Sequence, residues 1–130
     1  MANIAVRNTG TYTVENRSYI YQDPGVWTRG SVTLDITKFV AGTHYPAGYI
    51  KSGTVLGKVT ATGLYGPYDN TASDGREVAV GFLWDSVTPT SDKEAAPIWL
   101  FGFIKESKLP AAHGLDSAAK VDLAGWFKFF

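Results

Sequence analysis

The spacing of glycine and proline between residues 42 and 68 is the strongest constraint that this sequence places on its fold. Eight such residues divide the stretch into short segments, and one of these, residues 54–60, is rich in valine and threonine. β-branched residues favour strands, and closely spaced glycines within strand-like sequence indicate a backbone that passes near another backbone. The pattern predicts a mainly β protein built on a bent ribbon.

Alternation of apolar and polar residues predicts further strands. Between Ser31 and Thr37, the side chains of Val32, Leu34 and Ile36 share one face of a strand, because side chains alternate between faces. We also expect strands over residues 76–83 and 98–104, the second nearly continuous in apolar residues and placed in the interior. Residues 68–75 and 88–96 are polar and are predicted to be loops.

Helical signals occur only late in the chain, where we expect one or two short helices. Residues 109–114 begin with Leu-Pro and end in glycine, which predicts a single turn. Asp116 or Ser117 is suited to cap a short helix that runs through Leu123 and ends at Gly125.

Charge and composition exclude several classes of function. The chain has 130 residues, which predicts one compact unit, and its 12 basic and 12 acidic residues are scattered along it. Nucleic-acid binders concentrate basic residues in a stripe, so we expect no nucleic-acid partner. The absence of cysteine excludes disulfides and thiolate zinc sites. The most apolar window, residues 97–104, is too short to cross a bilayer, so we expect no membrane partner.

Catalytic motifs are also missing from the sequence. His44 and His113 are the two histidines, and both lie among glycines and small residues. A hydrolytic site brings together a nucleophile, a base and an orienting group, and no Gly-x-Ser-x-Gly motif is present. We therefore predict surface or turn histidines and no enzymatic activity.

Two segments resemble ligand-binding loops only superficially. Asp69 and Asp74 flank a polar loop, but the acidic residue that would close a calcium loop stands too early, so a turn at Asp74-Gly75 is the better interpretation. Residues 53–58 end in Gly-Lys but are one residue short of a P-loop, and strand-like sequence follows them. We expect no metal and no cofactor.

The C-terminus is aromatic, with Trp126, Phe127, Phe129 and Phe130 within its last five residues. Aromatic clusters of this kind usually form a core or a subunit interface. Exposed aromatic rings also stack on sugars, so a carbohydrate- or receptor-binding β module is one function that these residues allow.

Two blocks of sequence resemble a known family. The block 51–60 (KSGTVLGKVT) followed by the block 72–83 (ASDGREVAVGFL) resembles the lambda-like head decoration proteins of tailed bacteriophages. The order of apolar strand, Leu-Pro turn, short helix and final strand is similar too. The resemblance covers residues 32–130 and implies a head decoration β domain there, preceded by an N-terminal arm or strand region over residues 1–31.

The resemblance implies a β-clip-like domain and a structural role. Such proteins are homotrimers that bind the major capsid protein at local three-fold positions on the outer surface of the expanded head, and they stabilise it. The protein would be made in the host cytoplasm and reside in the virion. Residues that match the family pattern, which we interpret as fold determinants, are Gly53, Gly57, Asp74, Gly75, Ala79 and Gly81.

The N-terminal region supplies a mechanism for docking. Residues 3–21 alternate in polarity and have few neighbours in sequence to cover their apolar face. Pairing with a sheet edge of the major capsid protein would satisfy the backbone and cover that face. The alternative is pairing with residues 32–36 of the same subunit. The residues expected to contact the capsid are Ile4, Val6, Tyr12, Val14, Tyr19 and Tyr21.

Overall fold

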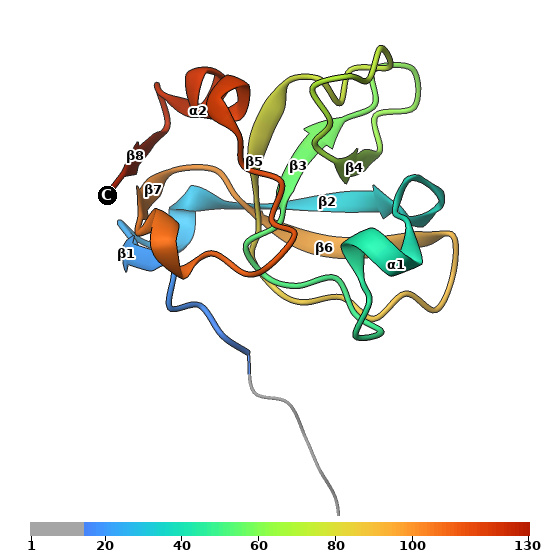
Figure 1. Cartoon of the computed structure of the whole chain (residues 1–130), viewed down its shortest axis with the longest axis horizontal. Coiled ribbons are helices and arrows are strands. Elements are labelled where there is room, and N and C mark those ends of the chain that lie inside the picture. Colours follow the sequence, from blue (N-terminus) through green and yellow to red (C-terminus); the bar gives the residue numbers. More distant parts are fainter. Residues whose placement is uncertain (1–14) are drawn as a thin grey trace, which may run out of the picture.

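The computed structural model describes residues 15–130, which form two β-sheets and a few short helices (Figure 1). The strands are β1 (Ile20–Gln22), β2 (Arg29–Asp35), β3 (Val55–Lys58), β4 (Tyr65–Pro67), β5 (Ala79–Leu83), β6 (Lys93–Trp99), β7 (Gly102–Ile104) and β8 (Phe127–Phe129). The helices are α1 (Ala41–His44), α2 (Ser117–Leu123) and the 3-10 turns η1 (Val26–Thr28), η2 (Ile36–Lys38) and η3 (Glu106–Lys108). Within this range, neither α1 nor α2 is long and apolar enough to span a membrane. The predicted mainly β fold is confirmed.

Five strands close into a small barrel in the order β2-β4-β3-β5-β6. β2 and β6 pair antiparallel along their whole length, and a parallel pairing of Leu34 in β2 with Tyr65 in β4 closes the barrel. The strand predicted over residues 31–37 is confirmed as far as Asp35, after which the chain enters η2. Closure leaves the barrel strands without free edges.

The close approach of backbones predicted for the glycines of residues 42–68 is confirmed at Gly57, and a second close approach occurs at Gly81, outside that stretch. A Cβ atom on Gly57 would lie 2.7 Å from the Cα of Arg76, and one on Gly81 would lie 2.6 Å from the carbonyl oxygen of Trp99. The register of β3 against β5 also shifts between Leu56 and Gly57. Side chains are therefore excluded at the points where the ribbon bends across its neighbours.

Two barrel strands, β3 and β5, and the C-terminal end of β6 are buried on both faces. Val55, Phe82 and Trp99 belong to one core cluster, whereas the residues next to them, Leu56, Leu83 and Ile98, belong to a second cluster. Because adjacent side chains of a strand point to opposite faces, β3, β5 and β6 each separate the two clusters. The first cluster also includes residues of α2, β7 and β8, so it joins the barrel to the C-terminal elements.

The prediction of one continuous strand over residues 98–104 is wrong. β6 ends at Trp99 in the barrel, Leu100 is 40% exposed, and β7 begins at Gly102 in the other sheet. The indole of Trp99 lies against Gly102, where a Cβ atom would be 2.7 Å from its Cε2. The chain therefore changes direction between β6 and β7, around the side chain of Trp99. The predicted loop 88–96 is also too long, because pairing with β2 extends β6 back to Lys93.

The second sheet has three strands in the order β1-β7-β8 and lies at the left of Figure 1. β1 pairs antiparallel with β7 through Ile20 and Ile104, and β8 pairs with β7 in parallel. Residues 20–22 therefore pair within their own subunit, but with β7 and not with residues 32–36. Residues 15–31, which the sequence assigns to the N-terminal region, contribute β1 to this sheet.

The predicted C-terminal helix is confirmed as α2. The carboxylate of Asp116 accepts a hydrogen bond of 2.8 Å from the Ala119 amide at the N-terminus of the helix. The turn predicted at residues 109–114 is not helical, because Ala112 and Gly114 both have positive φ values, 58° and 85°. The 3-10 turn η3 precedes it instead.

Candidate functional site

Tyr21 is the one predicted capsid contact that the described structure leaves on the surface, where it is 58% exposed. Four of the other five lie outside the described residues: Ile4, Val6, Tyr12 and Val14.

Tyr19 lies in the core of its own subunit. Its side chain is 0% exposed and its ring centroid lies 6.2 Å from that of Trp99. Its hydroxyl shares a hydrogen bond of 2.8 Å with Oγ of Ser52, and burial raises the pKa of Tyr19 to about 12. Assigning Tyr19 to the capsid contact is therefore corrected: this side chain is already covered within the domain.

An aromatic surface covers the outer face of the three-stranded sheet. The ring of Tyr21 stacks on that of Phe130 with centroids 4.4 Å apart, and Phe103 lies 6.3 Å from Phe130. Phe130 is 52% exposed, and the ammonium group of Lys128 lies 5.6 Å from its ring. We call Tyr21, Phe103, Lys128 and Phe130 the aromatic face. The aromatic face brings Tyr21 of β1 next to the C-terminal Phe130. Aromatic side chains on a surface are suited to a protein contact.

Contacts with residues 84–86 fix the segment from which residues 1–14 extend. The guanidinium of Arg17 donates a hydrogen bond of 2.9 Å to the Trp84 carbonyl, forms an ion pair with Asp85, and lies 4.8 Å from the Trp84 ring. The carboxylate of Glu15 accepts hydrogen bonds from the amide and hydroxyl of Ser86. We call residues 1–14 the arm and residues 15–17 its root, and the root is thus held against the segment that follows β5.

The residues that match the family pattern occupy structural positions. Gly53 has a φ of +95°, and a Cβ atom there would lie 2.8 Å from Cδ of Pro110. Gly75 has a φ of +113°, next to Asp74, whose carboxylate accepts hydrogen bonds from the Arg76 side chain. The buried Ala79 donates its amide hydrogen to Asp122 of α2 at 3.0 Å. Gly57 and Gly81 lie at backbone crossings, and the role of all six residues as fold determinants stays a prediction.

The acidic loop is held by its own hydrogen bonds. The Asp69 carboxylate accepts from the amide and the hydroxyl of Thr71, and these bonds lower the pKa of Asp69. The hydrogen bond from Arg76 likewise lowers the pKa of Asp74. In the described part of the chain, no three histidine, cysteine or acidic side chains gather as metal ligands. The carboxylates serve turn formation.

The two histidines meet at one small hollow of about 170 Å³, which no local sequence signal indicates. Nδ1 of His44 accepts a hydrogen bond of 2.8 Å from the Val40 amide, and Nδ1 of His113 accepts one of 2.8 Å from the Leu115 amide. Burial lowers the pKa of each histidine below the ordinary 6.5. Both imidazoles therefore act as neutral acceptors that close turns.

Acid should weaken the fold through these histidines. Their pKa values are depressed in the folded protein, so the unfolded chain takes up protons near pH 6.5 while the folded chain resists them. The contribution of the two histidines to the free energy of unfolding is present above the unfolded pKa of 6.5 and is lost as the pH falls below it. Melting temperatures measured between about pH 7.5 and about pH 5 check this. Most ordinary carboxylates titrate below that range, so the change can be assigned to the histidines. His44→Asn and His113→Asn keep an acceptor without the charge, and an unchanged slope in the double variant would contradict the account.

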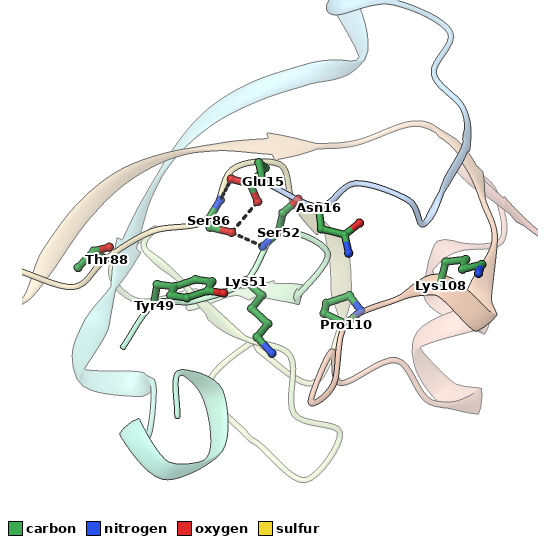
Figure 2. Close-up of a pocket in the computed structure, with 9 residues that line it drawn as sticks. All are labelled: Glu15, Asn16, Tyr49, Lys51, Ser52, Ser86, Thr88, Lys108 and Pro110. Carbon is green, nitrogen blue, oxygen red and sulfur yellow. Dashed lines mark hydrogen bonds between the residues drawn. The ribbon is translucent and has the colours of Figure 1, made fainter. Parts of the chain in front are cut away.

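A larger groove of about 640 Å³ opens beside the root of the arm (Figure 2). Its walls come from segments far apart in the sequence, and the lining residues are Glu15, Asn16, Tyr49, Lys51, Ser52, Ser86, Thr88, Lys108 and Pro110. Hydrogen bonds connect Glu15 to Ser86 and the oxygen of Ser86 to the Ser52 amide. Sequence reasoning missed this groove, because only the fold brings its residues together.

Comparison with known families agrees with the architecture. The sequence profile described as bacteriophage lambda head decoration protein D matches residues 11–124, which span the barrel, β1, β7 and α2. A comparison with curated proteins finds no match. Since the profile covers most of the chain, this protein belongs to the family of the bacteriophage lambda head decoration protein D.

Proposed function

We propose that this chain binds the outer surface of an expanded phage head at local three-fold positions, as a homotrimer, and stabilises the head. The observation that carries the proposal is the family match over residues 11–124. The major capsid protein is the partner, and the protein reaches the virion after synthesis in the host cytoplasm. Its contribution is backbone and apolar surface, not catalysis.

Docking is assigned to residues 1–14 together with Tyr21. The alternating pattern of residues 4, 6, 12 and 14 suits a strand added to a sheet edge of the capsid protein. The contacts of Glu15 and Arg17 with residues 84–86 support this, because a fixed root directs the arm and reduces the entropy lost on binding. In a trimer, three arms act together and raise the effective concentration of each.

Sedimentation of the full chain with expanded, undecorated heads tests the proposal. We expect saturable retention, with copy numbers in multiples of three. If no protein sediments with the heads, decoration is excluded as the function.

Deletion of residues 2–14 tests the arm separately. This deletion stops before Glu15 and Tyr19, so the melting temperature should hold while retention is lost. The substitutions Ile4→Ser and Val6→Ser should weaken retention, whereas Asn3→Ser and Ala5→Ser, of the opposite parity, should not. Full retention of the truncated chain would refute the arm mechanism and leave decoration standing.

A further inference from the structure

The groove beside the arm has a surplus of positive charge. Lys51 and Lys108 line it, and neither side chain takes part in the ion pairs found among residues 15–130. Its single acidic residue, Glu15, is already bound by the amide and hydroxyl of Ser86 at 3.0 and 2.6 Å. These neutral donors orient the Glu15 carboxylate but leave its charge, so two lysines and one glutamate give the groove lining an excess of one positive charge.

The remaining lining suits a polypeptide. Tyr49 and Pro110 offer apolar surface, and Asn16 and Thr88 offer donors and acceptors for a backbone (Figure 2). Peptide sites combine these features, with side-chain pockets for specificity and polar groups for the main chain. A volume of about 640 Å³ accommodates a few residues and not a whole domain.

The groove is continuous with the root of the arm. Glu15 and Asn16 form part of its wall, and residue 14 is joined directly to Glu15. A strand that pairs with the residues directly before Glu15 would lie at the mouth of the groove. A segment that binds in the groove would therefore come from the same protein with which the arm pairs.

We propose that this groove binds an acidic peptide segment of the protein on which the arm docks, with Lys51 and Lys108 pairing with its carboxylates. The inference rests on the proposed function, since it takes the major capsid protein as that partner. Charge at such a rim affects association rate and salt dependence most strongly, so the groove would guide the arm to its site.

Charge reversal provides the test, measured as the affinity of the full chain for expanded heads. The double variant Lys51→Glu/Lys108→Glu should bind about tenfold more weakly, or worse, because like charges repel the acidic segment. The matched control is Lys58→Glu/Lys93→Glu, which changes net charge equally at two exposed lysines outside the groove, and should stay within about twofold of the unmodified chain.

Two further measurements sharpen the result. Raising the salt from about 50 to about 300 mM should weaken the unmodified chain much more than the groove variant. Lys51→Arg/Lys108→Arg should keep the affinity, because the charge remains. Equal affinity of groove variant and control would overturn the inference and leave decoration intact, whereas failure of the unmodified chain to bind would overturn the proposed function. Competition by neutral oligosaccharides, without salt dependence, would also overturn it in favour of a sugar site.

Discussion

Replacing Trp99 with alanine is expected to lower the free energy of unfolding by about 4 kcal/mol. The side chain is fully buried and packs against Tyr19, Trp84 and Phe127, with ring centroids 5.2 to 6.2 Å apart. Its indole N–H donates a hydrogen bond of 3.1 Å to the buried Oγ1 of Thr28. Alanine would leave a cavity between the barrel and the three-stranded sheet and an acceptor without its donor.

Trp126 provides the control for this substitution. It is 60% exposed, so Trp126→Ala should change the free energy of unfolding by no more than about 0.5 kcal/mol. Urea denaturation followed by circular dichroism measures both variants. A loss at position 99 as small as that at position 126 would show that the two sheets do not share a core around Trp99.

Replacing Gly75 with alanine should destabilise the fold by about 3 kcal/mol or more, because strain and a steric clash combine there. The φ of +113° is a conformation that residues with a Cβ rarely adopt. The added Cβ would also lie 2.9 Å from the amide nitrogen of Thr60 and would clash with the carbonyl oxygen of Lys58. Both are backbone atoms, so no side-chain movement relieves the contact.

Two other glycines separate strain from clash. Gly63 has a φ of +72° with open space around it, so Gly63→Ala should cost about 1 kcal/mol through strain alone. Gly125 has neither a positive φ nor a close neighbour, so Gly125→Ala should be close to neutral. Chemical denaturation should rank the losses in the order 75, 63, 125. An equal loss at positions 75 and 63 would refute the steric part of the argument.

The sequence correctly predicted those helices and strands that depend on residues close to one another in the chain. The alternation at residues 31–37 marks β2, and Asp116 caps α2 as its position suggests. The closely spaced glycines of residues 42–68 predicted a close approach of two backbones, which occurs at Gly57. In each case the residue type itself imposes the local conformation or excludes a side chain.

Where the sequence predicted a strand or loop wrongly, contacts between distant segments determine its bounds. Residues 98–104 form an apolar run, but nothing local shows that the chain turns around Trp99 and enters another sheet. The C-terminal end of β6 is buried on both faces, so its continuous apolar sequence carries no signal of where the strand ends. Pairing with β2 similarly extends β6 into a segment that is polar enough for a loop.

The candidate site was partly predictable for the same reasons. Tyr19 and Tyr21 have the same parity, so alternation places them on one face, yet one is buried and the other is exposed. Tyr19 precedes β1, and the register of β1 shifts between Ile20 and Gln22, which breaks the simple alternation. The groove with Lys51 and Lys108 depends on segments far apart in sequence, so only the folded chain reveals it.

We propose that this domain works by adding backbone and apolar surface to a capsid, and cryo-electron microscopy of expanded heads incubated with the full chain would show this contact. We expect trimeric density on the outer surface at local three-fold positions, with the segment that precedes Glu15 continuing a sheet of the major capsid protein. Heads that remain bare after incubation at saturating concentration, or density confined to other positions, would contradict it.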